Sequence, residues 1–395
     1  MSQDFFEFFC PVKIVCGSRA LEHIPFELEV RGARQPLLIS DAGVVGAGLV
    51  DLVSGAMTAG GLGDAPVFDA VPPDSSMVSV AAAVSAYRQQ ECDSIIAIGG
   101  GSVMDTAKAV NILATEGGED LPRFAGANNL NRPLKPFIAI PTTAGTGSEV
   151  TSVSIIKDEQ SGTKIPFMSQ FLLPDVAVLD PRTTLKLPAM ITAATALDAL
   201  THACEAFTCL AKNPLSDAYA SAAIKRISES LIPVLDRSDD ASGRLDLALA
   251  ATMAGIAFSN SMVGLVHSLG HNVGAVAGVH HGVCMGILLP HVLEHNLEAR
   301  KQEIGELLLY LAGADTYAAT PAAERASASI NRIRQIREEA HKRCGLPRNL
   351  AETGKVKRDD LSKIASMSLD DGSIIFNPVE IGYEDALAVL DRAWA

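Results

Sequence analysis

The chain has 395 residues, which predicts two domains, or three, at roughly 100–200 residues each. Hydrophobic residues make up 48% and charged residues 20%, so a mainly disordered chain is excluded. With 32 basic against 46 acidic residues the net charge is −14, and such a field repels polyphosphate, which excludes nucleic acid as a partner.

The N-terminal segment, MSQDFFEFFCPVK, carries acidic residues among its phenylalanines and no basic region, so it is a poor signal peptide. No run reaches the roughly 18 apolar residues of a membrane span, and residues 247–258 suit a buried helix better. The seven cysteines are dispersed and form no C-x-x-C pair, which disfavours a disulfide framework or a thiolate zinc site. We therefore expect a cytoplasmic protein with no membrane partner.

The first half alternates short β-rich runs with stretches of helical spacing. This alternation predicts a parallel sheet covered by helices on both faces. Glycines and small residues separate the elements, as expected of turns in such a fold. The predicted strands are 35–40, 65–71, 94–98 and 137–140. The predicted helices are 75–90 and 102–115, and residues 42–61 are predicted to form a turn and a helix.

The second half has a different pattern. From about residue 187 the β signal fades, and Ala-rich stretches with periodic Leu, Ile and Met predict helices to the C-terminus. The shift predicts an α/β domain over residues 1–184 and an all-helical domain over residues 185–395, with a cleft between them. The polar segments 236–244 and 313–329 are predicted to be surface connections between helices.

A glycine loop follows the strand 94–98. Gly99, Gly100 and Gly101 lack the Cβ atoms that keep a backbone away from a pyrophosphate. A helix starting at Ser102 would offer free N–H groups to that anion. The spacing is neither G-x-G-x-x-G nor a Walker A motif, so a tight turn with Ser102 as N-cap remains the alternative.

Two more features point to nucleotide binding. The run 141–149, PTTAGTGSE, follows the strand 137–140 and offers hydroxyls and amides to phosphate or ribose. Both loops follow predicted strands, where open α/β sheets bind ligands. Asp41 follows the strand 35–40, and an acid there accepts from ribose hydroxyls and repels a 2′-phosphate, which favours NAD over NADP. The alternative for Asp41 is a cap on the next turn.

Histidines cluster in the helical half, since eight of the nine lie after residue 200. Asp198 and His202 are four residues apart on a predicted helix and therefore share one face. His267 and His271 repeat this spacing on another predicted helix, and His281 precedes a glycine. One carboxylate with several imidazoles suits Fe²⁺, Zn²⁺, Ni²⁺ or Co²⁺ better than Mg²⁺ or Ca²⁺. The alternative is that these side chains are satisfied core or surface groups.

These residues together resemble the iron-dependent (group III) alcohol dehydrogenase family over nearly the whole chain. The resemblance rests on the run 99–102 with Asp105, the run 141–149, the pair Asp198 and His202, and the segment 264–271 together with 281–282. It implies a Rossmann-like N-terminal domain with a parallel sheet plus an all-α C-terminal domain, the dehydroquinate synthase-like architecture.

The resemblance also implies which residues form the sites. His271 is placed near the metal, with a role towards the substrate and in proton relay. The implied metal is Fe²⁺, with Zn²⁺ or another divalent ion as alternative, and its ligands are Asp198, His202, His267 and His281. The implied NAD contacts are Asp41, Gly99, Gly100, Gly101, Ser102, Val103, Asp105, Thr142, Thr143, Thr146 and Lys164.

The implied activity is the NAD-dependent interconversion of a small primary alcohol or diol and its aldehyde. Three alternatives stay open: a lyase or cyclase of the dehydroquinate synthase type that recycles bound NAD, a hydroxyacid–oxoacid transhydrogenase, and a non-enzymatic metal-storing or filament-forming scaffold. Because twofold assemblies are the commonest, we expect a homodimer or a higher homo-oligomer.

Overall fold

The computed structural model describes residues 5–159 and 162–395, which divide into two compact units. The first, called the sheet unit below, comprises residues 10–143 and 147–186. The second, called the helical unit, comprises residues 5–9, 144–146 and 187–395. The short segment 144–146 thus interrupts the sheet unit and packs with the helical one.

A six-stranded sheet lies at the centre of the sheet unit, in the order β1-β9-β6-β4-β2-β3, and all its paired neighbours are parallel. The predicted parallel sheet is therefore confirmed. The central strand β4 is buried along its whole length, as expected of a strand covered on both faces. The strands are β1 (Lys13–Cys16), β2 (Pro36–Ile39), β3 (Val67–Phe68), β4 (Ser94–Gly99), β6 (Phe137–Pro141) and β9 (Val176–Leu179).

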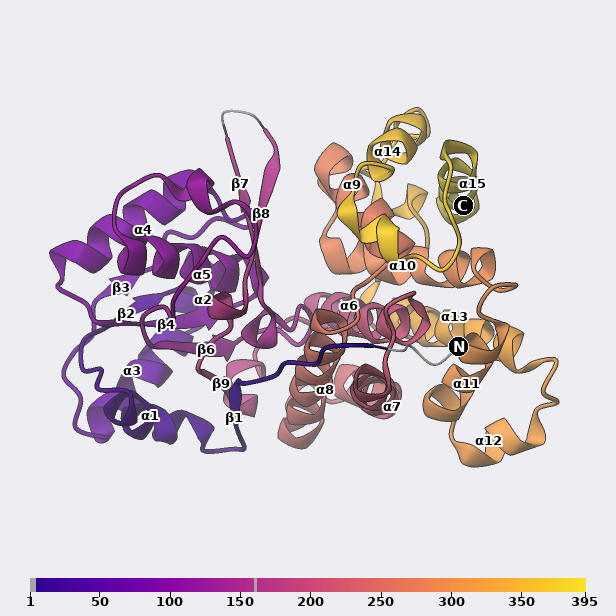
Figure 1. Cartoon of the computed structure of the whole chain (residues 1–395). Helices are drawn as coiled ribbons and strands as arrows, with labels where there is room; N and C mark the ends of the chain where they lie inside the picture. Colours follow the sequence, from indigo (N-terminus) through magenta and orange to yellow (C-terminus); the bar gives the residue numbers. More distant parts are fainter. Residues whose placement is uncertain (1–4, 160–161) are drawn as a thin grey trace. The chain divides into compact units, whose positions relative to one another are not determined.

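Alternate side chains of the strands pack on opposite faces of this sheet. Ile95 and Ala97 belong to the core beneath α4 and α5, whereas Ile96 and Ile98 belong to the core beneath α1 and α3. Figure 1 shows the two helix layers on either side of the strands. The covering helices are α1 (Ile24–Val30), α3 (Leu49–Ala59), α4 (Met77–Gln89) and α5 (Gly101–Glu116).

The sheet unit also departs from the prediction. The turn and helix expected over 42–61 are found as a short helix, α2 (Ala42–Gly46), and α3, which are separated because Gly48 adopts a left-handed φ of 75°. The strand expected over 65–71 is only the two residues of β3. Neither β1 nor β9 is predicted from the sequence, and the same holds for a second sheet in the order β5-β8-β7, in which β7 and β8 are antiparallel. Its strands are β5 (Gly126–Ala127), β7 (Val153–Lys157) and β8 (Lys164–Met168).

The helical unit is built around α6, in which every residue from 192 to 208 is buried. The predicted all-helical character is confirmed, and in the described residues none of the helices has the length and apolar content needed to cross a membrane. The helices are α6 (Ala189–Thr208), α7 (Pro214–Asp236), α8 (Ala241–Ser259), α9 (Leu265–Ala277), α10 (His281–His295), α11 (Lys301–Ala312), α12 (Ala314–Ala319), α13 (Arg325–Cys344), α14 (Asp360–Ser368) and α15 (Tyr383–Trp394).

The two predicted surface connections are shorter than expected. Residues 313–329 contain α12 and the start of α13, because their alanines favour helix. The segment 236–244 is reduced to residues 237–240, since Asp240 caps α8 by accepting from the Gly243 N–H at 3.1 Å. Arg244, expected in a surface connection, lies buried inside α8.

Candidate metal centre and cofactor loops

Three helices supply the predicted metal ligands. Asp198 and His202 lie one turn apart on α6, and His267 lies in the first turn of α9. His281 is the first residue of α10. Asp198, His202 and His267 are buried, and the side chain of His281 is 37% exposed, which leaves one side of the group open to solvent.

These side chains gather round one oxygen, Asp198 Oδ1. His281 Nε2 lies 3.3 Å from it, His202 Nδ1 3.8 Å and His267 Nε2 4.0 Å. One ligand atom each from Asp198, His267 and His281 lies within 4.8 Å of the others, and His202 stands beside this group. Donors about 2 Å from a common ion are separated by roughly 3–3.5 Å, so small shifts would bring this set to ligating distance.

The hydrogen-bond state of these atoms tests whether the residues fit a cation. Among the described residues, Asp198 Oδ1, His202 Nδ1 and His267 Nε2 are buried and have no hydrogen-bond partner. Buried polar atoms nearly always have a hydrogen-bond partner, so three unpaired acceptor atoms that face one another indicate a binding site for a cation. The donors therefore fit a divalent ion.

The electrostatics agree with this fit. Burial lowers the pKa of His202 to about 3, and the neighbouring imidazoles of His267 and His281 add to that lowering. Burial alone raises the pKa of Asp198, but the imidazoles around it outweigh this effect and hold that pKa below its usual range. Neutral imidazoles beside an ionised carboxylate are the protonation states that a metal ion requires.

Glycines bring α10 close enough to α6 to form the group. A Cβ on Gly282 would lie 2.3 Å from the Ala194 carbonyl oxygen, and a Cβ on Gly286 would lie 2.9 Å from Leu197 Cδ1. Only glycine permits such an approach of the two backbones at residue 282. Because His281 is adjacent to Gly282, this contact fixes the position of the His281 backbone relative to Asp198.

His271, the predicted proton-relay residue, lies one turn after His267 on α9. Its ring stacks on that of His281, with centroids 5.3 Å apart, and its side chain is 34% exposed. His271 Nδ1 is hydrogen-bonded to Asp371 Oδ2 at 2.9 Å, an interaction that no pattern in the sequence predicts. Burial raises the pKa of Asp371 and the bond to His271 lowers it, with a net lowering. A residue 100 positions away in sequence gives no local signal of this contact.

Glu205 is a second site residue that was not predicted from the sequence. Its Oε2 lies 2.5 Å from His267 Nδ1, and its Oε1 accepts from the Val266 N–H at 2.7 Å. Burial raises its pKa to about 7. The signal was present in the sequence, because Asp198, His202 and Glu205 are spaced four and three residues apart and so lie on one face of a helix.

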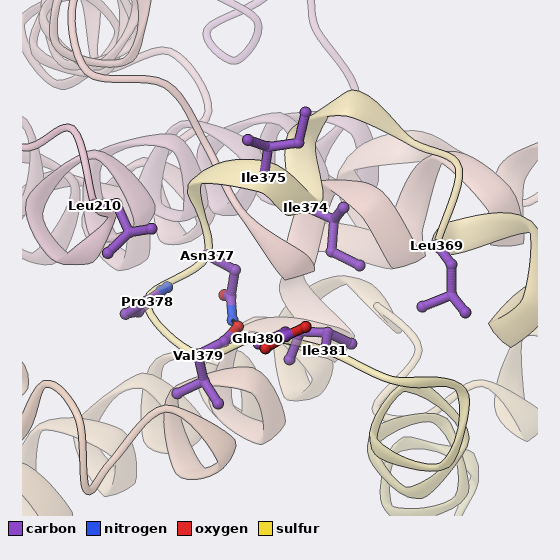
Figure 2. Close-up of a pocket in the computed structure, with 9 residues that line it drawn as sticks. All are labelled: Leu210, Leu369, Ile374, Ile375, Asn377, Pro378, Val379, Glu380 and Ile381. Atoms are coloured by element: carbon purple, nitrogen blue, oxygen red, sulfur yellow. Dashed lines mark hydrogen bonds between the residues drawn. The ribbon is translucent and has the colours of Figure 1, made fainter.

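A surface hollow of about 310 Å³ opens beside the loop after η7 (Gly372–Phe376) in the helical unit. None of the four predicted metal ligands lines it, so we do not assign it to the metal centre. A void of about 10 Å³ borders Glu205 and shares Asn377 and Pro378 with the hollow. Figure 2 shows the lining residues, which are Leu210, Leu369, Ile374, Ile375, Asn377, Pro378, Val379, Glu380 and Ile381.

The glycine loop joins β4 to α5. The helix begins at Gly101 with Gly100 as N-cap, and the Ser102 hydroxyl donates to the Pro73 carbonyl, so the alternative of Ser102 as N-cap is wrong. In the described part of the chain no side chain caps this helix end, which leaves its first N–H groups available to an anion. A Cβ on Gly99 would lie 2.5 Å from Val103 Cβ, so packing of the first turn also requires glycine there.

The second loop and Asp41 lie beside the glycine loop. The Thr142 N–H donates to the Gly99 carbonyl at 3.0 Å, and Thr143 lies next to Gly100. Thr146 falls in the segment that packs with the helical unit. Asp41 follows β2, the neighbour of β4, and its Oδ1 accepts from the Val44 N–H at 2.9 Å. Asp41 therefore caps α2, and its position at the carboxyl end of the sheet remains compatible with ribose binding.

Asp105 and Lys164, two of the predicted NAD contacts, have partners within the sheet unit. The carboxylate of Asp105 accepts from Ser148 Oγ and from the Ile155 N–H, both at 3.0 Å. Lys164 is an exposed residue of β8 and pairs with Asp74 Oδ1 at 3.2 Å. The bonds of Asp105 connect segments of the unit, which gives this residue a structural role, whereas the Lys164 pair is exposed and contributes little to stability.

Two family models match the sequence. The one described as iron-containing alcohol dehydrogenase matches residues 11–181. The one described as the C-terminal part of the Fe-containing alcohol dehydrogenase family matches residues 192–394. Together they extend over both units of the structure.

Curated relatives and solved structures resemble the chain along its full length. The NAD-dependent methanol dehydrogenase of Bacillus methanolicus is 36% identical over 98% of this chain and 99% of its own. The 1,3-propanediol dehydrogenase of Klebsiella pneumoniae is 33% identical over the whole of both chains. A crystal structure of 1,3-propanediol oxidoreductase superimposes with a TM-score of 0.94 at 32% identity, covering 99% of this chain and 100% of that one. An alcohol dehydrogenase from Oenococcus oeni gives 0.93 at 30%, with the same coverage.

Proposed function

Because the chain belongs to the iron-containing alcohol dehydrogenase family, it is an oxidoreductase acting on alcohols, and we propose that it interconverts a small primary alcohol or diol and its aldehyde with NAD. The observation that carries the proposal is the group of three buried, unpartnered ligand atoms around Asp198. Two of the matched relatives are named for methanol and 1,3-propanediol, which supports a small primary alcohol as substrate.

We assign the metal site to Asp198, His202, His267 and His281. We propose Fe²⁺ as its ion, although Zn²⁺ binds such ligand sets more tightly and is the expected competitor. When bound, the ion supplies a Lewis acid that makes the alcohol hydroxyl easier to deprotonate. The carboxylate of Asp198 offsets part of the ion's charge, and the buried walls around it strengthen the interaction by excluding water.

His271 is the residue that we propose to move the hydroxyl proton. Its Nδ1 is held by Asp371, so its Nε2 is the nitrogen left to exchange a proton with the substrate. The negative charge of Asp371 stabilises the imidazolium form that a proton transfer creates. The partial exposure of His271 supports passage of the proton on to solvent.

We place the dinucleotide on the two loops of the sheet unit. The open helix end at Gly101 suits the pyrophosphate, and Asp41 suits a ribose hydroxyl. NAD, when bound, accepts the hydride from the carbinol carbon. Asp105 also holds neighbouring segments of the unit in place. The proposed contacts are Asp41, Gly99, Gly100, Gly101, Ser102, Val103, Asp105, Thr142, Thr143, Thr146 and Lys164.

The proposed cofactor and metal sites assign a role to each domain of the chain. We propose that residues 1–184 form the NAD-binding domain and residues 185–395 the metal-binding domain. We further propose a cytoplasmic homodimer or higher homo-oligomer. The support is the dispersed cysteines, without a C-x-x-C pair, and the prevalence of twofold assemblies.

Anaerobic reconstitution with Fe²⁺ or Zn²⁺, followed by a panel of alcohols and aldehydes with NAD(H) and NADP(H), tests the proposal. We expect net NADH formation with small primary alcohols and loss of both bound metal and activity in His267→Ala. Turnover without release of NADH would point instead to a lyase or a transhydrogenase. Full metal content in His267→Ala would contradict the ligand assignment.

A further inference from the structure

The buried helix α6 presents a third ionisable group in line with two proposed metal ligands. Asp198, His202 and Glu205 follow one another along one face of the helix, and the side chain of Glu205 is only 5% exposed. A buried carboxylate is unfavourable unless donors surround it. The donors that surround Glu205 come from the start of α9.

Each oxygen of Glu205 has a different partner on α9. Oε1 accepts from the Val266 N–H at 2.7 Å, and Oε2 lies 2.5 Å from His267 Nδ1. The carboxylate therefore satisfies an N–H that an α-helix leaves open at its N-terminus and meets the positive end of the helix dipole. It also fixes the ring of His267 through the nitrogen that faces away from Asp198.

The same helix end has a neutral partner on its other side. Asn377 Oδ1 accepts from the Leu265 N–H at 3.4 Å and from Asn296 Nδ2 at 2.9 Å. A Cβ on Gly264 would lie 3.2 Å from both Asn377 Oδ1 and Glu205 Oε1, so glycine leaves room for the two side chains. Glu205 and Asn377 thus share the capping of α9, but only Glu205 touches a proposed metal ligand.

We propose that Glu205 is a positioning residue that holds His267 in the tautomer and orientation required for metal binding, an inference that rests on the metal site proposed above. An acceptor at Nδ1 keeps the proton there, so Nε2 presents its lone pair towards Asp198 and the ion. The carboxylate also makes His267 a stronger ligand.

The substitution Glu205→Gln distinguishes this role from simple space filling. A glutamine has nearly the same shape but only one acceptor oxygen, whereas the Val266 N–H and the His267 Nδ1–H both need an acceptor. If the glutamine oxygen serves Val266, its NH₂ group faces His267 and selects the tautomer protonated at Nε2, which cannot bind a metal. Glu205→Asp keeps both acceptors at a shorter reach and is expected to rescue part of the loss.

The experiment measures the affinity of the full-length apoprotein for Zn²⁺ and the visible spectrum of the Co²⁺-loaded protein, for the native chain, Glu205→Gln, Glu205→Asp and Asn377→Ala. We expect about 10- to 100-fold weaker binding and altered Co²⁺ bands in Glu205→Gln. We expect a smaller loss in Glu205→Asp. The control Asn377→Ala loosens the same helix end without touching His267, and it should lower the melting temperature while keeping the Zn²⁺ affinity within a few-fold of native.

Two results would overturn the inference. Native Zn²⁺ affinity with unchanged Co²⁺ bands in Glu205→Gln would show that His267 needs no charged partner to bind the metal. A loss of Zn²⁺ affinity in Asn377→Ala equal to that in Glu205→Gln would show that Glu205 acts only as a cap of α9. His267→Ala separates these results from a failure of the proposed function. If that variant loses metal while Glu205→Gln keeps it, only the role of Glu205 is refuted, and if both keep it, the metal site itself is wrong.

Discussion

Gly282→Ala tests whether the close approach of α10 to α6 builds the metal centre. The added Cβ would lie 2.3 Å from the Ala194 carbonyl oxygen and 2.7 Å from its carbonyl carbon. Carbon and oxygen atoms in contact are normally more than 3 Å apart, so the two backbones must separate by roughly 1 Å. The obstacle is backbone inside a buried helix, which no rotamer change can relieve.

The size of the effect follows from two opposing contributions. Alanine in place of a helical glycine stabilises by up to about 1 kcal/mol, whereas overpacking in a core costs about 1–3 kcal/mol. The clash is severe, so we expect a net loss of about 1–2 kcal/mol, or roughly 2–8 °C in melting temperature for a unit of this size. Because His281 is the preceding residue, a displacement of 1 Å should weaken metal binding by about tenfold or more.

Calorimetry of the apoprotein and a Zn²⁺ titration measure the two effects. Gly55→Ala in α3 is the matched control, since its Cβ meets nothing within 4 Å, and it should stabilise the protein by about 0.5–1 kcal/mol without changing metal affinity. In Gly286→Ala the added Cβ would lie 2.9 Å from Leu197 Cδ1 and 3.3 Å from Leu197 Cβ, a side-chain rather than a backbone contact. Its effects on melting temperature and Zn²⁺ affinity should therefore lie between those of Gly282→Ala and Gly55→Ala. If Gly282→Ala melts and binds Zn²⁺ like the native chain, the packing contact does not position His281.

Two further predictions concern the sheet unit. Glu27 is buried, and its Oε1 lies 2.6 Å from Lys13 Nζ and its Oε2 2.9 Å from Arg31 Nη1. Burial raises the pKa of the Glu27 carboxyl, but the hydrogen bonds from the two cations outweigh this effect and leave that pKa below the usual 4.5. The unfolded chain therefore binds the proton first as pH falls, so stability from this carboxylate is complete above about pH 4.5 and is lost below it. Denaturant unfolding of Glu27→Gln should show a deficit of about 1–3 kcal/mol at pH 7 that shrinks towards acid pH, and a deficit independent of pH would refute the role of its charge. Asp41→Asn keeps an acceptor for the Val44 N–H but removes the charge, so kcat/KM with NADP relative to NAD should rise about tenfold, and an unchanged ratio would remove Asp41 from the ribose site.

Strong local patterns in the sequence predicted much of the fold. The run 94–101 combines a continuous apolar strand with three glycines, and both the buried β4 and the turn into α5 follow from it. The spacing of Asp198 and His202 placed them on one face of a helix, as found in α6. In each case neighbours in sequence determine the local structure, so one segment contains the whole signal.

The features that were missed depend on contacts between distant segments. Strands β1 and β9 are four residues each and pair with one another across more than 150 positions, so neither has enough length to stand out. Asp371 meets His271 through the fold alone. Glu205 is different, because its spacing was visible in the sequence, but a lone glutamate in an alanine-rich helix is usually a surface residue.

Because α6 is buried, the spacing of Asp198, His202 and Glu205 along it points to a functional site. On a half-exposed helix, Asp198, His202 and Glu205 would form an ordinary polar face in water. On a helix buried over residues 192–208, each of these groups must lose its hydration when the chain folds. Glu205 recovers the loss through two donors of α9, whereas Asp198 Oδ1 and His202 Nδ1 find no hydrogen-bond partner among the described residues. Groups that break the local rule for a protein core mark a functional site, and here an ion is the partner that would satisfy them.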